Sequence, residues 1–315
     1  MKTEKILTVT LNPAIDVNVY VDTLDKERVN FAYDEHFDAA GKGTNVSRAL
    51  TKWGIDNTAL LVTGRDNAKQ YFDRLAEENI KCLVVYNEGK IRENLSIITD
   101  DGNLFKLNRK GSDFTEENYQ EVLDKMDEFG LQDAIVVFAG SLPKIGLSKE
   151  KFMDMIRYVQ QKGAVVALDT TALTAQQIVD LKPWIIKPNQ EELEDMTGKK
   201  ASSYEDIVAI AREIIDKGIE NVVVSLGADG LIGINKDQAV KVDVPDVPVR
   251  SNVGAGDTTL SGFIAAMSRG DSFADAVKFA GACGSAAVTT EGTNPPSSQV
   301  VQEMLDLVVA KELSL

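Results

Sequence analysis

Short runs of β-branched and apolar residues alternate with longer amphipathic segments along most of the chain. The strand-like runs are 6–10, 58–62, 134–139, 165–169, 184–187 and 222–226. The helix-like segments between them are 42–53, 68–79, 115–129, 149–162, 174–180 and 204–217. Alternation of this kind predicts a mostly parallel central sheet with helices on both faces. We therefore expect a single α/β domain over residues 1–315, completed by helices at 273–289 and 298–313.

Two regions interrupt this alternation. In residues 15–38 and 84–109, apolar and polar side chains follow one another with period two, and turn signals lie at 87–89 and 101–102. This pattern is typical of antiparallel strands. We expect the two regions to form a small antiparallel β lid on the domain. Their exposed edges and apolar face could pair with a second copy, so a homodimer through the lid is one expectation.

Composition argues against several classes of partner and site. The chain has 49 acidic and 34 basic residues, a net charge of −15, which disfavours nucleic acid and anionic membranes. No apolar run is long enough for a bilayer or a signal peptide, so we expect a cytoplasmic protein. Cys82 and Cys283 lack paired spacing, and we expect reduced thiols. His36 is the only histidine, which argues against a zinc site or a Ser/His/Asp triad.

Familiar nucleotide-binding motifs do not occur in the chain. There is no G-x-x-x-x-G-K-[ST] sequence, and no G-x-G-x-x-G sequence follows the first strand-like run. Instead, turns that contain glycine or asparagine follow three apolar runs, at 138–143, 186–192 and 224–230. Because the ligand crevice of an open parallel sheet lies at the carboxyl ends of its strands, we expect these turns to line one site.

The stretch SNVGAGDTTLSGF at 251–263 contains the strongest functional signal. Gly254, Ala255 and Gly256 directly precede Asp257 at the start of a helix-like run. Their backbone N–H groups suit the charge on a transferring phosphoryl group, and Asp257 could take the proton from the attacking hydroxyl. A structural explanation is also open, because an acidic residue in the first turn stabilises the helix dipole.

A second glycine-containing stretch, AAGKGTNVSRAL, occupies residues 39–50. Gly41 and Gly43 permit close approach of the backbone to a ligand. Asn45 and the backbone amides could then bind sugar hydroxyls, and Lys42 could bind an anionic group. The alternative is an ordinary loop before a capped helix.

Two further stretches suggest a nucleotide site. In KPNQEEL (187–193), Asn189 and Glu192 could organise a hydrated Mg²⁺ ion near nucleotide phosphates, with Lys187 beside them. The same spacing also defines a capping box. In SLGADGLIG (225–233), a nucleotide could be held by Ser225 and the backbone at Gly227 and Gly230, although a plain hairpin turn explains the sequence equally well.

Basic residues gather in the predicted lid although the chain is acidic overall. A solvated surface is the usual explanation of such a run of charges. Arg92, however, lies beside Asn94 in an alternating strand, one side of which faces the crevice. Because arginine binds phosphate through paired hydrogen bonds, we expect Arg92 to bind an anionic substrate group, with Arg109 as the second choice.

Taken in order, the motifs G-K-G-x-N, K-P-N-x-x-E, S-x-G-x-x-G and G-A-G-D resemble those of the ribokinase-like carbohydrate kinases, also called the phosphofructokinase-B family. The resemblance covers essentially the whole chain. TLNPAID (10–16) and IREN (91–94) resemble the branch of 1-phosphofructokinases and tagatose-6-phosphate kinases. The resemblance implies a ribokinase-like fold and an enzyme that uses Mg²⁺ and ATP. Its reaction converts tagatose 6-phosphate or fructose 1-phosphate into a bisphosphate.

The resemblance also implies roles for individual residues. Asp257 corresponds to the catalytic base, and residues 254–256 correspond to the anion hole. The substrate would be bound by Asp16, the loop from Gly41 to Asn45, Arg92 and Ser141. The ATP site would include residues 225–230, and the helix around Gly281 would approach the adenine. A related branch binds a monovalent cation beside the anion hole, so K⁺ is an open question.

Two other functions stay open. A kinase of an unphosphorylated sugar or a nucleoside could have the same fold, but it leaves the lid arginines without a role. A non-catalytic protein that senses a sugar phosphate is the second alternative, against which Asp257 and the adjacent small residues argue.

Overall fold

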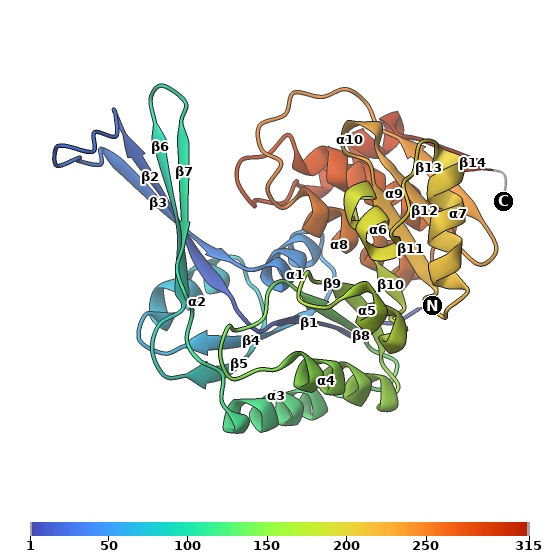
Figure 1. The fold of residues 1–315 in the computed structure, drawn as a ribbon, viewed down its shortest axis with the longest axis horizontal. Coiled ribbons are helices and arrows are strands. Elements are labelled where there is room, and N and C mark those ends of the chain that lie inside the picture. The colour runs from blue at the N-terminus through green and yellow to red at the C-terminus, as the bar shows by residue number, and fades with distance from the viewer. Residues whose placement is uncertain (1, 314–315) are drawn as a thin grey trace.

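The structure, a computed structural model, describes residues 2–313. Its main feature is a ten-stranded sheet in the order β14-β13-β12-β11-β10-β9-β8-β1-β4-β5 (Figure 1). From β11 to β5 the neighbouring strands run parallel. These strands are β1 (Ile6–Thr10), β4 (Thr58–Gly64), β5 (Cys82–Asn87), β8 (Ile135–Ala139), β9 (Val165–Asp169), β10 (Ile185–Ile186) and β11 (Asn221–Ser225). The predicted parallel sheet is therefore confirmed.

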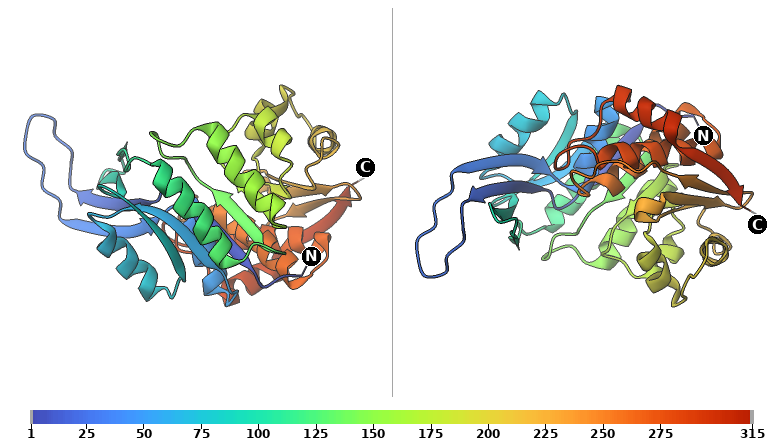
Figure 2. Two further views of the ribbon diagram at one scale, coloured as in Figure 1. Left: turned by 90° about the horizontal axis from the view of Figure 1, so that it is seen from below. Right: turned by 90° about the horizontal axis from the view of Figure 1, so that it is seen from above.

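Helices cover both faces of this sheet (Figure 2). One face carries α3 (Glu116–Phe129), α4 (Lys149–Gln161), α5 (Ala175–Leu181), α6 (Gln190–Thr197) and α7 (Tyr204–Ile215). The other carries α1 (Lys42–Lys52), α8 (Ala255–Arg269), α9 (Phe273–Ala287) and α10 (Ser298–Leu307). Apolar side chains spaced three or four residues apart place one stripe of each helix against the sheet. In α3, for example, Val122 and Met126 are fully buried.

The sheet continues beyond β11 with antiparallel strands. They are β12 (Leu231–Asn235), β13 (Ala239–Asp243) and β14 (Val309–Leu313), and a single 3₁₀ turn, η1 (Gly227–Asp229), connects β11 to β12. The prediction of one helix over 298–313 is wrong in its second half, because the chain becomes extended at Val308 and pairs with β13. Pairing satisfies the backbone groups of an edge that β13 would otherwise leave open.

The lid is a separate four-stranded sheet in the order β3-β2-β6-β7. Its strands are β2 (Ala14–Val21), β3 (Asp34–Ala40), β6 (Arg92–Thr99) and β7 (Leu104–Asn108). The expectation of a purely antiparallel lid needs correction, since β2 and β6 are parallel. Residues 84–87 belong to β5 in the main sheet, which contradicts the predicted start of the lid at 84. One face of β5 is buried at Val85 and Asn87 while Tyr86 on the other face is exposed, so β5 shows the same period-two pattern as a lid strand.

The lid projects from the edge of the main sheet near β4 and β5 (Figure 1). At its root, Ile15 and Ala39 pack with residues of β4 and of α2 (Ala68–Glu77), including the fully buried Tyr71. The lid strands thus start from a rigid base next to the carboxyl ends of the parallel strands. Between residues 2 and 313, no helix is both long enough and apolar enough to cross a membrane.

Candidate active site

The small residues before Asp257 form the start of α8. Gly254 adopts a left-handed conformation with φ of 79°, which favours glycine. No described side chain caps the helix, so the N–H groups of its first turn have no side-chain acceptor. A Cβ atom built on Gly256 would lie 3.1 Å from Lys187 Nζ. The turn thus combines free N–H groups with a nearby ammonium group, which is a favourable arrangement for an anion.

Asp257 is buried in this turn, with only 6% of its surface exposed. Its Oδ2 accepts a hydrogen bond of 2.8 Å from Asn45 Nδ2. Burial, and then the nearby charge of Asp169, raise the pKa of Asp257 to about 6. The hydrogen bond from Asn45 and the charges of Lys42 and Lys187 limit this rise in pKa. A carboxylate whose pKa lies close to neutral pH is suited to act as a general base.

Asp169, to which the sequence motifs assign no role, joins this cluster from the end of β9. Its Oδ1 accepts a hydrogen bond of 3.0 Å from Lys42 Nζ, while its buried Oδ2 has no partner among the described residues. Burial alone would lower the pKa of Lys42, but attraction to Asp169 and Asp257 raises it. Lys42 is therefore already paired with a carboxylate, whereas we expected it to be available for an anionic substrate group. The one sequence feature that could have identified Asp169 as a site residue is its position at the end of the predicted strand 165–169.

The glycines of residues 39–50 serve close packing. Gly41 precedes α1 with φ of 141°, a conformation that favours glycine. A side chain on Gly43 would collide with Thr10 and would approach the carbonyl oxygen of Val9 to 2.9 Å. Small residues at both positions bring the start of α1 against the end of β1, and this places Asn45 beside Asp257.

A second polar cluster lies on the lid. Asn94 Nδ2 donates to Asp16 Oδ1 at 2.8 Å, and Arg92 Nη1 donates to Asn94 Oδ1 at 3.2 Å. Asn12, which has no assigned role in the sequence motifs, connects this cluster to Ser141. Its Nδ2 donates to Ser141 Oγ at 3.1 Å, and its carbonyl accepts from Arg92 Nε at 3.3 Å. The strand register explains the grouping, because Asp16 and Asn94 are directly paired across β2 and β6.

Both charged members of this lid cluster are partly withdrawn from water. Burial raises the pKa of Asp16 and lowers the pKa of Arg92, although each charge counteracts the shift of the other. Arg92 also lines a small pocket together with Gly111 and Ser112. A guanidinium group in such a partly desolvated place gains more from an anionic ligand than one on an open surface.

Arg109 does not belong to this cluster. It lies just after β7, is exposed, and forms an ion pair with Glu93. Glu93 is adjacent to Arg92 along β6, so its side chain points to the opposite face of the lid. The structure therefore brings Asp16, Arg92 and Asn94 together and leaves Arg109 elsewhere.

The predicted metal residues form a complete capping box at the start of α6. Asn189 Oδ1 accepts from the backbone N–H of Glu192, and Glu192 Oε2 accepts from the backbone N–H of Asn189, each at 2.8 Å. Glu192 also lines a pocket of about 310 Å³ together with Asp169 and Lys187. Between residues 2 and 313, no group of three or more His, Cys, Asp or Glu side chains is positioned to hold a metal ion.

The predicted nucleotide turn lies next to this capping box. Ser225 ends β11, and its N–H donates to the carbonyl of Pro188 at 3.0 Å. Gly227 and Gly230 follow in the hairpin turn to β12, both with positive φ. Gly281, in contrast, is buried in α9, where a Cβ would lie 2.7 Å from Val242 Cγ1. Close packing of α9 against β13 therefore explains why a glycine occupies this position. The approach of Gly281 to an adenine stays a prediction.

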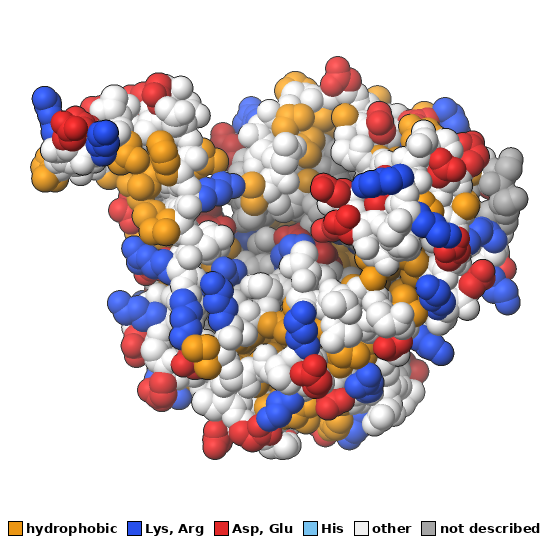
Figure 3. Space-filling model, in the orientation of Figure 1, with side chains coloured by type: hydrophobic (Ala, Val, Ile, Leu, Met, Phe, Trp, Pro, Cys, Tyr) orange, Lys and Arg blue, Asp and Glu red, His pale blue; other side chains and the backbone are white. Residues whose placement is uncertain are grey.

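The lid cluster and the cluster around Asp257 adjoin at the ends of β1 and β8. Ser141 follows Gly140, and a Cβ built on Gly140 would lie 3.6 Å from Lys42 Cβ. Figure 3 shows the molecule hollowed between the lid and the part that carries α6 and α10, with charged side chains at the opening. Groups that suit a sugar, a phosphate and a proton transfer therefore surround one crevice.

Comparisons with known proteins identify the family to which the chain belongs. The model of the pfkB family carbohydrate kinases matches residues 5–300. The 1-phosphofructokinase of Vibrio cholerae is 31% identical over 260 residues, which are 82% of this chain and 82% of that enzyme. The 1-phosphofructokinase of Escherichia coli is 30% identical over 307 residues, covering 96% and 98%. The crystal structure of phosphofructokinase-2 from Escherichia coli in complex with potassium has a TM-score of 0.89 at 28% identity, covering 97% and 99%.

The fold and these relatives define a phosphotransferase with an alcohol acceptor. The chain belongs to the pfkB family of carbohydrate kinases, and it is a sugar-phosphate kinase of that family. The resemblance of its motifs to this family is confirmed. The family implies ATP and a divalent metal ion as further components of the reaction.

Proposed function

We propose that this kinase transfers the γ-phosphoryl group of ATP to a free hydroxyl of a ketohexose monophosphate, which yields a bisphosphate and ADP. Fructose 1-phosphate is the first candidate because the relatives that match at 30–31% identity are 1-phosphofructokinases. Tagatose 6-phosphate, which carries the same charge, is the second. The observation that carries the proposal is Asp257, a buried carboxylate with a raised pKa at the start of an uncapped helix.

The proposed reaction is a single in-line transfer. Asp257 takes the hydroxyl proton while the substrate oxygen forms its bond to the γ-phosphorus of ATP. The bond between that phosphorus and the β,γ-bridging oxygen breaks, and the electron pair leaves with ADP. N–H groups at Gly254, Ala255 and Gly256 donate to the transferring group, which meets the need of phosphoryl transfer for electrostatic stabilisation. The proton on Asp257 then passes to solvent.

The lid cluster supplies the proposed contacts to the sugar phosphate. Arg92 would bind its phosphate, since a guanidinium group forms strong charge-assisted hydrogen bonds with phosphate oxygens. Asp16 and Asn94 lie on the same lid face and would hold sugar hydroxyls. Ser141 and the backbone from Gly41 to Asn45 would contact the substrate from the opposite side.

The pocket beside α6 supplies the proposed nucleotide site. Lys187 lines this pocket, and Ser225 is joined to its Pro188 by a backbone hydrogen bond. We propose that these two residues and the turn from Gly227 to Gly230 would hold the phosphates. The residues present fit a hydrated Mg²⁺ ion, because the exposed Glu192 lines one pocket together with Asp169 and magnesium prefers oxygen ligands. We therefore propose that Glu192 would lie near the ion, with Asn189 beside it in the capping box. The ion would neutralise charge on the nucleotide phosphates.

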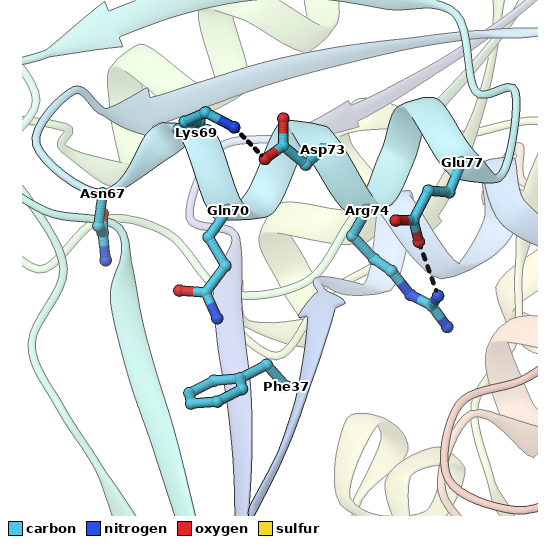
Figure 4. Close-up of a pocket in the computed structure, with 7 residues that line it drawn as sticks. All are labelled: Phe37, Asn67, Lys69, Gln70, Asp73, Arg74 and Glu77. Carbon is cyan, nitrogen blue, oxygen red and sulfur yellow. Dashed lines mark hydrogen bonds and ion pairs between the residues drawn. The ribbon is translucent and has the colours of Figure 1, made fainter.

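The outer face of the lid supports the proposal of a homodimer. Phe37, Val17, Leu95 and Leu107 are directly paired in one row across the four strands. Phe37 and Leu107, at the ends of this row, are 46% and 59% exposed, and apolar side chains gather on the lid in Figure 3. Figure 4 shows a pocket between Phe37 and the polar side chains of α2. Val17 and Leu95, in the middle of the row, pack on the core of this chain, so the exposed ends at Phe37 and Leu107 are the part suited to a second lid.

A panel of acceptors tests the proposed function. The purified protein would be assayed for ADP release with fructose 1-phosphate, tagatose 6-phosphate, fructose 6-phosphate, fructose, ribose and adenosine, with and without K⁺. We expect turnover with a ketohexose monophosphate and identification of the bisphosphate by mass spectrometry. Turnover with an unphosphorylated sugar or adenosine alone would favour the first alternative. Binding of a sugar phosphate without any turnover would favour a sensor.

A further inference from the structure

Arg48 is a buried cation close to the proposed base, and the mechanism above does not use it. It lies in α1, one turn after Asn45, and only 4% of its surface is exposed. Arginine is rarely buried unless it is paired. Arg48 Nε donates to Glu78 Oε2 at 2.7 Å, and Nη2 donates to the carbonyl of Ala39 at 2.6 Å. These two bonds fix the plane of the guanidinium group.

The third hydrogen bond of Arg48 is the one that reaches toward the catalytic carboxylate. Nη1 donates to Asn45 Oδ1 at 3.2 Å, and more weakly to Thr293 Oγ1 at 3.5 Å. The other end of the same carboxamide, Nδ2, donates to Asp257 Oδ2 at 2.8 Å. Arg48, Asn45 and Asp257 therefore form a continuous hydrogen-bonded chain from α1 to α8.

A carboxamide has two ends that differ chemically but are nearly equal in shape. If the amide of Asn45 turned over, its oxygen would face the carboxylate of Asp257 and its N–H₂ group would face the guanidinium of Arg48. Both contacts would then be repulsive, because a carboxylate is only an acceptor and a guanidinium is only a donor. Arg48 therefore allows one orientation of the amide.

We propose that Arg48 is a positioning residue that holds the N–H of Asn45 toward Asp257, and thereby keeps the catalytic carboxylate in place for proton transfer. This inference rests on the proposed function, in which Asp257 is the base. Glu78, at the end of α2, is the anchor for Arg48. The three donors of a lysine ammonium radiate from one nitrogen, so a lysine at this position would not reach these separated acceptors together, whereas the planar fork of arginine does.

The other groups around Asp257 do not replace this contact. Lys42 comes from α1, Asp169 from β9 and Lys187 from the segment after β10, and each acts on Asp257 through its charge. Asn45 provides the side-chain hydrogen bond to the carboxylate. Loss of its orientation should therefore affect the geometry of the base rather than the affinity for either substrate.

The test is the kinetics of Arg48→Met with the acceptor that the panel identifies. We expect kcat to fall about 10-fold, the usual worth of a hydrogen bond to a charged group, while both KM values change less than about two-fold. The acid limb of the pH–rate profile should move to higher pH, because a misoriented amide no longer lowers the pKa of Asp257. Arg48→Lys should recover part of kcat.

A double-mutant cycle separates positioning from general stability. If Arg48 acts through Asn45, then Arg48→Met should not lower kcat further in an Asn45→Ala background. Arg212→Met is the matched control, since Arg212 is a helical arginine in α7 that donates to the carbonyl of Lys236. It should leave kcat and the pH profile unchanged.

An equal loss of kcat in both backgrounds would overturn the inference, and so would a loss of thermal stability with unchanged kcat and pH profile. If Arg48→Met does not fold, Glu78→Gln takes its place, because it keeps the shape of the anchor and should lower kcat in the same direction. An unchanged kcat in Glu78→Gln would then count against the inference. Asp257→Asn distinguishes the two proposals: if it stays active, the proposed function itself fails.

Discussion

The buried cluster around Asp257 and the lid lie on two sides of the same crevice, and they hold their charged groups differently. In the buried cluster, Arg48 pairs with Glu78 and Asp257 with Asn45 inside the protein, and the partly exposed Lys42 pairs with the largely buried side chain of Asp169. In the lid, β7 is exposed throughout and the ion pair between Arg109 and Glu93 is partly exposed, although Asp16 and Arg92 on the other lid face are partly buried.

This difference has energetic consequences. Removing one member of a buried pair leaves the other without compensation and costs about 3–5 kcal/mol, whereas an exposed ion pair contributes about 0.2–1 kcal/mol. The buried cluster therefore keeps the chemical groups in one geometry. The lid contributes individual contacts that can change without loss of the fold. We expect substitutions in the cluster to affect turnover, and substitutions in the lid to affect the choice and affinity of the sugar.

The largest effect should come from Asp257→Asn. The substitution keeps the size of the side chain but removes the proposed base, so kcat should fall about 10²–10⁴-fold. The affinity for ATP, measured by calorimetry, should change little, because the backbone N–H groups of the turn remain. A variant with near-normal kcat would show that the buried cluster does not perform the proton transfer.

Asp275→Asn is the matched control for this prediction. Asp275 lies in the first turn of α9, as Asp257 lies in the first turn of α8. Its substitution removes the same favourable interaction with a helix dipole. Equal losses of activity in the two variants would indicate a structural role for both carboxylates.

On the lid side, Arg92→Ala should raise the KM for the sugar phosphate about 10- to 100-fold, through loss of a charge-assisted hydrogen bond. The KM for ATP should stay within about two-fold of the original value. Arg109→Ala is the comparison variant, because Arg109 pairs with Glu93 on the other lid face and should have the smaller effect. Equal rises of both KM values in Arg92→Ala would contradict a specific role in sugar-phosphate binding.

The pH dependence of the rate tests the role of Asp257 in the unsubstituted protein. Asp257 must be deprotonated to accept a proton, and its pKa is raised to about 6. We therefore expect kcat/KM to be nearly constant above this pH and to fall about tenfold per unit below it. Asn45→Ala should move this limb to higher pH, because it removes a hydrogen bond that lowers the pKa of Asp257. A rate that is independent of pH down to 4.5 would contradict the assignment of the base.

The features predicted from sequence are those set by local patterns. The runs at 6–10 and 165–169 form strands with the predicted bounds, and the turn before Asp257 begins a helix as expected. The missed features depend on partners far away in the chain. β14 looks like the end of a helix until its pairing with β13 is known, and β5 looks like a lid strand because only one of its faces is well buried.

The same distinction applies to the site. Asp16 and Asn94 were predictable as polar residues of alternating strands, and their pairing across β2 and β6 brings them together. Asp169 and Lys42 are 127 residues apart in the chain, so no local pattern reveals their ion pair. Arg109 lies just beyond β7. The lid face to which its side chain points depends on how β7 pairs with β6, and the apolar residues of β7 do not alternate clearly enough to predict this pairing.

The smallest effect should come from Glu192→Gln. Glu192 caps α6 through its bond to Asn189, and it is also the residue that we propose near the metal ion. If Glu192 lies near a bound ion, the Mg²⁺ concentration for half-maximal rate should rise several-fold, because a neutral amide is a weaker ligand than a carboxylate. The capping bond to Asn189 survives, since glutamine keeps an acceptor oxygen. Asp206→Asn alters the equivalent capping box of α7, formed with Ser203 and away from the crevice. A change in melting temperature alone, equal in both variants, would mean that Glu192 only caps the helix.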